Sequence, residues 1–450
     1  MEKSLTSQLR TLSYPTGEVQ RVQILRWENW DSLDFLFPEQ NPDAIGCFSR
    51  IYRKFLVPAC PWLFGNMVLF CLPEDIKLPF SLETGKFGRV SSPLTAAAAA
   101  LEQNLRFRSG HPVFRSRETE DFYRELENRG CLQLVRGRLP VTTIIPVGNS
   151  SGFLTQTAPT ASMKVNASFF IMDRFDCATV YDHLGTPLGL CIKNGRMINP
   201  PLYRREALLV KQDGTVCVTM PDLRELAVEV GGVEYRHGKN ARIYTRPENP
   251  RVFGRGKKLV IVGCQVAAVV EAGSVPVPAS GFVLCPEGEC RANPGDRVVY
   301  RGMEDVRFGI QVGNSILRDG EMTRGFRSRF YNIRHLEPVP YPPSLYPMNF
   351  KGGRAARIAL GADREGKPML LWAEGAAKLG YVPGTDSRGA SLWELGKICE
   401  DAGMWNGVNL DGGGSAQILL GNSRALKISD RKETDHSEAE RPVPLGLVIR

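Results

Sequence analysis

The stretch GASLWELGKICEDAGMWNGVNLDGGGSAQILL (residues 389–420) decides how this chain is expected to fold, because a helix, a strand and a turn follow one another in it. Ser391 and Glu394 have the spacing of a capping box, in which the first side chain caps a helix and the second reaches back to the cap. Gly403 suits the end of that helix. Four nonpolar residues recur on one helical face: Leu392, Leu395, Ile398 and Cys399.

A strand over residues 405–410 is expected to end at Asp411, where Gly412, Gly413, Gly414 and Ser415 form a tight turn before a strand over 416–420. Consecutive glycines cost backbone entropy, which indicates unusual dihedral angles or close approach of a ligand to the backbone. Successive exposed amides can form an anion-binding nest. A plain glycine-rich hairpin with a turn aspartate explains the same spacing equally well. A Walker-type phosphate loop is excluded because no Gly-Lys-Ser/Thr follows.

Short strands and turns fill the chain from about residue 132 onward. Asn194-Gly195 and Asp213-Gly214 each predict a hairpin. Residues 132–147 are also expected to form a hairpin, with its turn at 136–139, and residues 257–270 and 281–286 add further strands. We therefore predict an α+β fold, a strand-rich mixed α/β domain over 131–450, with a smaller N-terminal region over 1–130.

The N-terminal region contains no chemical motif. Helices are expected near residues 94–105 and 118–129. The apolar stretch 55–72 is broken by Pro58 and Pro61, so we interpret it as buried strand and turn, and expect no transmembrane segment.

The net charge of +9 comes from scattered cations without a Lys/Arg block, so no nucleic-acid partner is expected. The eleven cysteines include no CxxC pair, which argues against a zinc ribbon. The first 17 residues have no apolar run, so a cytoplasmic location is the default expectation.

Several segments together resemble the phosphodiester glycosidase family. The segment NLDGGGSAQILL (409–420) is similar to the family's signature, and other matches follow in the family's order over about residues 130–450. They are NASFF (166–170), GTPLGLCIKNG (185–195), SGFVLCPEGEC (280–290), GDRVVYR (295–301), GNSILRDG (313–320), RIALG (357–361), SRGASL (387–392) and ERPV (440–443). The resemblance implies hydrolysis of the bond between a sugar's anomeric carbon and a phosphate.

The chain departs from the family pattern at three places. Ile358 stands where the family usually has threonine, and Glu374-Gly375 where it has Asp-Gly. Residues 324–350, rich in Arg, Tyr and Pro, resemble an insertion.

The residue types suggest roles at such a site. Arg357 is the candidate phosphate clamp, since a guanidinium offers two parallel hydrogen bonds to oxyanions, and Arg354 is a second candidate. Asp411 is the candidate nucleophile, base or electrostatic stabiliser. The expected substrate-binding groups are Asn166, Asn409, Gly412, Gly413, Gly414, Ser415 and Ser387. The alternative for Asp411 is a structural role that closes the turn by hydrogen bonds to Gly413 or Gly414. The alternative for Asn166 is a strand-end asparagine with left-handed backbone geometry.

A second carboxylate is usual in glycoside hydrolysis. Asp173, Asp176 and Glu374 are the candidates. His183 and His237 are weaker partners. The sequence implies no definite cofactor and leaves open a divalent cation such as Ca²⁺, although no loop has an EF-hand pattern.

The predicted function is hydrolysis of a sugar-1-phosphodiester, such as N-acetylglucosamine-1-phosphate linked to a sugar or polymer, releasing free sugar and a phosphomonoester. The expected partner is a small or polymeric sugar-phosphate substrate. The alternatives are a non-catalytic carbohydrate- or phosphosugar-binding module and an assembly protein that binds a partner through residues 1–130. The sequence does not define the oligomeric state.

Overall fold

The computed structural model describes residues 5–38, 44–148, 152–172, 177, 179–201, 205–246, 248–323 and 353–450. Strands dominate it, which confirms the predicted strand-rich α+β class. The five α-helices of the described residues are short: α1 (Ala44–Ile51), α2 (Val57–Ala59), α3 (Pro93–Asn104), α4 (Arg117–Asn128) and α5 (Leu392–Asp401). No helix of the described part of the chain is long and apolar enough to cross a membrane.

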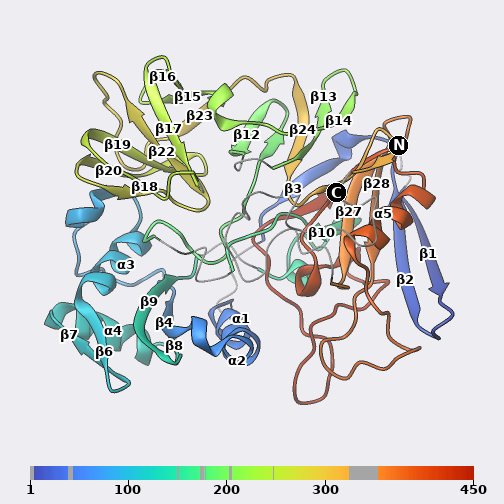
Figure 1. Ribbon diagram of the computed structural model, residues 1–450, viewed down its shortest axis with the longest axis horizontal. Coiled ribbons are helices and arrows are strands. Elements are labelled where there is room, and N and C mark those ends of the chain that lie inside the picture. Colours follow the sequence, from blue (N-terminus) through green and yellow to red (C-terminus); the bar gives the residue numbers. More distant parts are fainter. Residues whose placement is uncertain are drawn as a thin grey trace.

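Two sheets position the C-terminal part of the chain (Figure 1). The seven-stranded sheet has the order β1 (Thr6–Ser13), β2 (Val19–Arg26), β28 (Pro368–Ala373), β27 (Arg357–Ala362), β29 (Asn406–Asn409), β25 (Ser315–Arg318), β26 (Glu321–Met322). The four-stranded sheet has the order β3 (Leu33–Leu36), β31 (Gly446–Ile449), β10 (Met163–Asn166), β30 (Ile418–Leu420).

The main core lies between these two sheets. Trp372 and Leu360 of the seven-stranded sheet pack in one buried cluster with Val165 and Leu447 of the four-stranded sheet. Helix α5 covers the opposite face of the seven-stranded sheet through the buried residues Leu392, Leu395 and Cys399. The predicted capping box is confirmed, because the Ser391 hydroxyl accepts from the Glu394 N–H and the Glu394 carboxylate accepts from the Ser391 N–H.

The remaining strands form smaller sheets. One has the order β12 (Arg196–Asn199), β11 (Cys191–Lys193), β24 (Val306–Gln311), β13 (Ala207–Lys211), β14 (Val216–Thr219), and another β16 (Val233–Arg236), β15 (Ala227–Val230), β23 (Val298–Arg301). The third has the order β17 (Ala241–Thr245), β22 (Gly281–Pro286), β19 (Arg255–Val262), β20 (Gln265–Ala272), β5 (Arg89–Val90). A three-stranded sheet of β8, β4 and β9, whose bounds are given below, and two short pairs complete the set. The pairs are β6 (Leu105–Arg108) with β7 (His111–Phe114) and β18 (Arg251–Val252) with β21 (Val275–Pro276).

The local hairpin predictions are confirmed. β11 pairs with β12 across Asn194-Gly195, and both turn residues have the positive φ angles, 50° and 73°, that such a turn requires. β13 likewise pairs with β14 across Asp213-Gly214.

The predicted hairpin over residues 132–147 is wrong. β8 (Leu132–Val135) and β9 (Leu139–Pro146) do not pair with each other, because β4 (Gly65–Phe70) lies between them and pairs with both. The connection crosses the start of β4, where the N–H groups of Arg138 and Leu139 both donate to the Phe64 carbonyl. The second half of the apolar stretch 55–72 is therefore a buried central strand, as predicted. Its first half is not strand and turn, because it forms short helical turns that end at Leu63 and leave Trp62 exposed.

The first strands of the chain belong to the sheets of its C-terminal part. β2 pairs with β28, and β3 pairs with β31. Helices α3 and α4 lie apart from these sheets, on the far side of the molecule (Figure 1). A domain boundary near residue 130 stays a prediction, but residues 6–36 are built into the same sheets as residues 357–449.

Candidate functional site

The glycine-rich loop lies where β29 ends and β27 begins. The Leu410 N–H donates to the Ile358 carbonyl at 2.8 Å, and the Asp411 N–H donates to the Ala167 carbonyl at 3.0 Å. The Gly413 N–H donates to the Ala356 carbonyl at 2.8 Å. These bonds hold the loop against both sheets, with a 3₁₀ turn over Gly413–Ser415 rather than a simple hairpin turn.

Asn166 braces this loop from β10. Its Nδ2 donates to the Asp411 carbonyl at 2.8 Å, and its Oδ1 accepts from the Gln417 N–H at 2.9 Å. The side chain is buried and joins the residues on either side of the glycine turn. The geometry thus gives Asn166 a structural role in shaping the loop, and its role as a substrate ligand stays a prediction.

The glycines are required at this loop for different reasons. A side chain at Gly412 would place its Cβ 2.7 Å from the Ala356 carbonyl oxygen. A side chain at Gly414 would overlap the Arg441 guanidinium and the Asp430 carboxylate. Gly413 faces open space but has a φ of 60°, which favours glycine. Position 414 therefore requires glycine because charged side chains lie close to its backbone, and position 413 because of its backbone conformation.

Asp411 is a buried carboxylate at the rim of the loop. Burial raises its pKa from 3.8 to about 6, although the Ser415 hydroxyl, the Arg441 charge, the Gly412 N–H and the Arg357 charge all act in the opposite direction. Its Oδ1 accepts from the Gly412 N–H at 2.8 Å. A carboxyl group that changes charge near neutral pH is suited to acid–base or electrostatic work.

Arg357 begins β27 and is buried beside Asp411. Burial lowers the pKa of the Arg357 guanidinium to about 10, and the Asp411 charge acts against this decrease. Nε donates to the Ala390 carbonyl at 3.2 Å, and one Nη donates to the Gly353 carbonyl at 3.0 Å. The side chain is thereby fixed, and it keeps its charge at neutral pH.

A second buried arginine, which the sequence reasoning did not single out, lies on the other side of the loop. Arg441 forms two hydrogen bonds to Asp430 Oδ2, at 3.0 and 2.8 Å, and the Lys378 ammonium lies 2.6 Å from Asp430 Oδ1. Burial alone would lower the pKa of Arg441. The charges of Asp430 and other acidic neighbours, among them Asp411, outweigh burial and raise this pKa. The sequence marks Arg441 only as part of the segment ERPV (440–443), which resembles the family pattern but was given no role.

Apart from the Ser415 hydroxyl, which acts on the Asp411 carboxylate, two buried polar side chains at this edge have no hydrogen-bond partner among the described residues. They are the Asn409 amide, whose residue is completely buried, and the Ser168 hydroxyl, which follows the carbonyl that accepts from Asp411. Unpaired buried polar groups are costly and uncommon in folded proteins. Their presence supports the predicted binding role of Asn409 and adds Ser168 to the candidate site.

Glu374 and Ser387 belong to a separate buried network. One Glu374 oxygen accepts from Arg21 at 3.0 Å and from the Ser387 hydroxyl, and the other accepts from the Lys427 N–H at 2.8 Å. The Ser387 oxygen also accepts from the Arg21 N–H at 2.9 Å. Both carboxylate oxygens are therefore used to join three distant segments, an arrangement that favours a structural role over the predicted catalytic one.

The other candidates lie elsewhere or outside the described residues. Arg354 pairs with Glu394, the capping residue of α5, at 2.9 Å. His183 contacts Thr95 of α3, and burial lowers its pKa to about 4, while His237 accepts from the Ile243 N–H in a turn. Asp173 and Asp176 lie outside the described residues, as does the predicted insertion at 324–350.

Within the described parts of the chain, no group of three or more His, Cys, Asp or Glu side chains is arranged to hold a metal ion.

The site thus combines a buried carboxylate, a glycine-rich backbone loop and two fixed arginines. The family model described as phosphodiester glycosidase matches residues 159–450, and the chain belongs to this family.

Three curated relatives are each named N-acetylglucosamine-1-phosphodiester alpha-N-acetylglucosaminidase. The protein from Bos taurus is 38% identical over 200 residues, covering 38% of this chain and 35% of the relative. The protein from Homo sapiens is 35% identical over 200 residues, covering 38% and 36%. The protein from Mus musculus is 27% identical over 218 residues, covering 40% of each. The match thus spans about two fifths or less of the length of these relatives.

The solved structures to which this chain is similar include a hypothetical protein from Synechocystis, with a TM-score of 0.41 and 16% identity, covering 99% of this chain and 62% of the other. They also include the zebrafish N-acetylglucosamine-1-phosphodiester alpha-N-acetylglucosaminidase catalytic domain auto-inhibited by its pro-peptide, with a TM-score of 0.40 and 14% identity, covering 100% and 83%.

Proposed function

We propose that this chain hydrolyses the glycosidic bond of a sugar-1-phosphodiester, such as N-acetylglucosamine-1-phosphate linked to a sugar or polymer, and releases free sugar and a phosphomonoester. The observation that carries the proposal is the position of Asp411, buried between the charges of Arg357 and Arg441 at the rim of the glycine loop. Membership of the phosphodiester glycosidase family supports the reaction class.

In this reaction the leaving group departs as a phosphate monoester anion, so strong proton donation to it is less important than for an alcohol. The transition state has positive charge at the anomeric carbon. Ionised Asp411 stabilises this charge while water attacks the carbon, or it attacks the carbon itself as the phosphate monoester leaves. In the second case water then cleaves the sugar–Asp411 ester and releases the free sugar. Arg357 holds the phosphate by charge-assisted hydrogen bonds. The Asn409 amide and the Ser168 hydroxyl, unpaired among the described residues, bind sugar hydroxyls or phosphate oxygens.

The test is hydrolysis of a panel of sugar-1-phosphodiesters and matched aryl glycosides by the wild type and Asp411→Asn. We expect free sugar from the phosphodiesters and a loss of at least about 100-fold in kcat in the variant. Asp401→Asn, at the exposed end of α5, is the matched control and is expected to keep wild-type rates.

The second candidate function is a phosphosugar-binding module without catalysis. The buried pairing of Arg441 with Asp430 and the fixed Arg357 suit phosphate binding as well as catalysis. Titration calorimetry with N-acetylglucosamine 1-phosphate separates the two functions. Binding by a wild type that turns over no phosphodiester would establish the binding module and overturn the hydrolase.

A further inference from the structure

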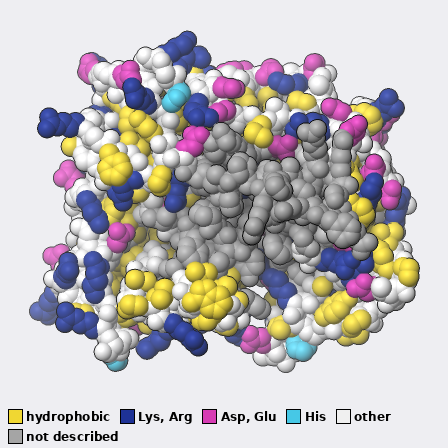
Figure 2. Space-filling model, in the orientation of Figure 1, with side chains coloured by type: hydrophobic (Ala, Val, Ile, Leu, Met, Phe, Trp, Pro, Cys, Tyr) yellow, Lys and Arg dark blue, Asp and Glu magenta, His cyan; other side chains and the backbone are white. Residues whose placement is uncertain are grey.

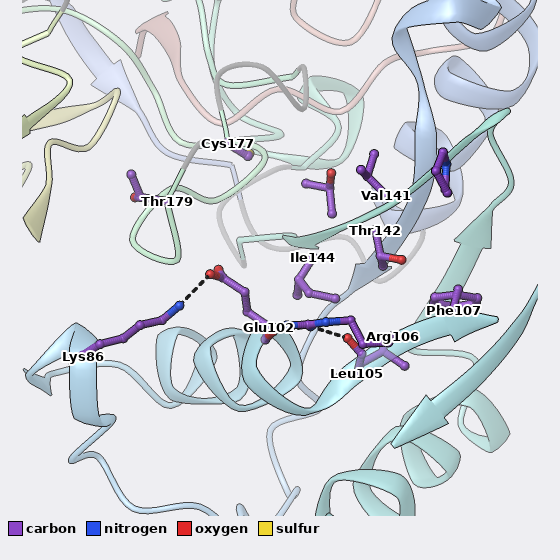
Figure 3. A pocket seen from close by; sticks show the side chains of 12 residues that line it. Lys86, Glu102, Leu105, Arg106, Phe107, Val141, Thr142, Ile144, Cys177 and Thr179 are labelled. Atoms are coloured by element: carbon purple, nitrogen blue, oxygen red, sulfur yellow. Dashed lines mark hydrogen bonds and ion pairs between the residues drawn. The ribbon is translucent and has the colours of Figure 1, made fainter. Parts of the chain in front are cut away.

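A cavity of about 530 Å³ lies far along the chain from the glycine loop, between α3, β6, β9 and the residues Cys177 and Thr179 (Figure 3). Thr142 and Ile144 of β9 line it on one side, and Thr179 faces them from the opposite side. A smaller cavity of about 130 Å³ shares Lys86, Glu102 and Thr179 with it and continues to Arg251. We call the two cavities together the α3–β9 groove.

The groove is lined by more positive than negative charge. Lys86, Arg106 and Arg251 line it, against the single carboxylate of Glu102, which lies 3.5 Å from the Lys86 ammonium. Arg106 Nη1 donates to the carbonyls of Glu102 and Leu105 at 2.8 and 2.7 Å. The guanidinium is therefore fixed at the end of α3 by backbone groups and not by a carboxylate (Figure 3).

Further arginines surround the β6–β7 hairpin beside the groove. Arg108 and Arg136 are exposed, and neither has an acidic partner within 4 Å among the described residues. A Cβ at Gly110, in the hairpin turn, would lie 3.0 Å from Arg136 Nη1, so this guanidinium covers the turn next to Arg108. Lys and Arg side chains gather on this part of the surface, at the lower left of Figure 2.

Neighbouring cations without carboxylate partners repel each other, and a bound anion relieves this repulsion. The spread of these arginines and of the groove indicates a ligand with several anionic groups. The groove also offers the Thr142 hydroxyl and the half-exposed side chain of Val141, which suit a hydroxyl-rich ligand with small apolar faces. Single-stranded nucleic acid normally stacks on a row of exposed aromatic side chains. The lining of the groove contains two aromatic residues, Phe107 and the buried Phe87, one in each cavity.

We propose that the α3–β9 groove and the arginines of the β6–β7 hairpin bind the phosphate groups of an extended sugar-phosphate polymer. This inference rests on the proposed function, since it supplies a second contact for a polymeric substrate. A polymer held at two places on one chain gains effective concentration at the cleavage site.

The experiment measures binding and turnover separately. The probe is a fluorescein-labelled oligomer of N-acetylglucosamine linked by 1-phosphodiesters, followed by fluorescence anisotropy. The variants are Arg108→Ala with Arg136→Ala, which removes two exposed charges, and Thr142→Phe, which fills the groove. The matched control is Arg10→Ala with Arg196→Ala, which removes two charges from β1 and β12.

Each groove variant is expected to bind the oligomer about tenfold more weakly, and the double arginine variant is expected to show a smaller salt dependence. The control double variant is expected to bind as the wild type does. For hydrolysis, KM for the oligomer rises in the groove variants while kcat and KM for a small phosphodiester stay unchanged.

Three results would overturn the proposal: wild-type affinity in either groove variant, equal weakening in the control, or equally tight binding of a single-stranded DNA of the same charge. Binding that depends on the groove without any turnover would sink the proposed hydrolase and leave the polymer site intact. Turnover of small phosphodiesters without groove-dependent binding would support the proposed hydrolase and overturn the polymer site.

Discussion

Replacing Asp411 by asparagine is expected to stabilise the protein at alkaline pH. Burial raises the pKa of this carboxyl from 3.8 to about 6, so the folded protein keeps a proton that the unfolded chain has released. The free energy of unfolding of the wild type therefore falls as the pH rises from about 4 to about 6, between the pKa values of the unfolded and folded states. Above pH 6 the whole destabilisation by the buried charge is present. The difference in pKa corresponds to about 3 kcal/mol.

Asparagine has nearly the shape of aspartate and cannot ionise. At pH 8 the Asp411→Asn protein is expected to unfold with a free energy about 3 kcal/mol higher than the wild type, or a Tm about 3 °C higher for a chain of this size. At pH 4 the gain falls to about 0.5 kcal/mol, because the wild-type carboxyl is then protonated in the fold. Thermal and urea unfolding at several pH values measure the difference.

Asp430 is a control residue whose pKa is shifted in the opposite direction, downward. Burial alone would raise its pKa, but the charges of Arg441 and Lys378 lower it. Its stabilisation is therefore present at neutral pH and is lost as the pH falls through its folded pKa, so Asp430→Asn is destabilised at pH 8. An Asp411→Asn protein that is no more stable than the wild type at pH 8, or that gains as much at pH 4, would refute the reasoning.

Three further predictions concern the rest of the site. Arg357→Met is expected to lower kcat by about 100-fold in the phosphodiester assay, and Arg357→Lys by less, because lysine keeps the charge but not the paired donors. Glu374→Gln is expected to lower the free energy of unfolding by about 2 kcal/mol without changing kcat, as measured by urea unfolding and by turnover of the remaining folded enzyme. Gly414→Ala is expected to lower the Tm sharply, because its Cβ would overlap the Arg441 guanidinium. Gly413→Ala has open space around its Cβ and is expected to lower the free energy of unfolding by only about 1 kcal/mol. Equal losses of stability in the two variants would contradict the packing argument.

Local features of the fold could be predicted from the sequence. The capping box at Ser391 and the turn at Asn194-Gly195 each depend on residues within a few positions of one another, and both are present as expected. The strand predicted over 405–410 is present as Asn406–Asn409, so Asp411 lies just beyond a strand end, before the glycines, as expected.

Non-local pairing could not be predicted in the same way. β8 and β9 are neighbours in the sequence, but β4, more than 60 residues earlier, lies between them. Arg21 reaches Glu374 across 353 residues, and nothing near either residue in the sequence marks the pair. The same applies to Arg441, whose importance follows from its contact with Gly414 and not from its own neighbours.

The arrangement around the glycine loop argues that this loop is kept for function and not for stability. Asp411 is ionised at a cost in a buried position, and the Asn409 amide is buried without a partner in the described structure. The surroundings hold these groups in place, because Asn166 joins both sides of the loop and the Asp430–Arg441 pair packs against Gly414. Several unfavourable features gathered at one well-braced loop are typical of a site whose chemistry requires them. A loop with only a structural role would be more stable with an apolar residue in place of Asp411, which is why the pH dependence of its asparagine variant separates the two interpretations.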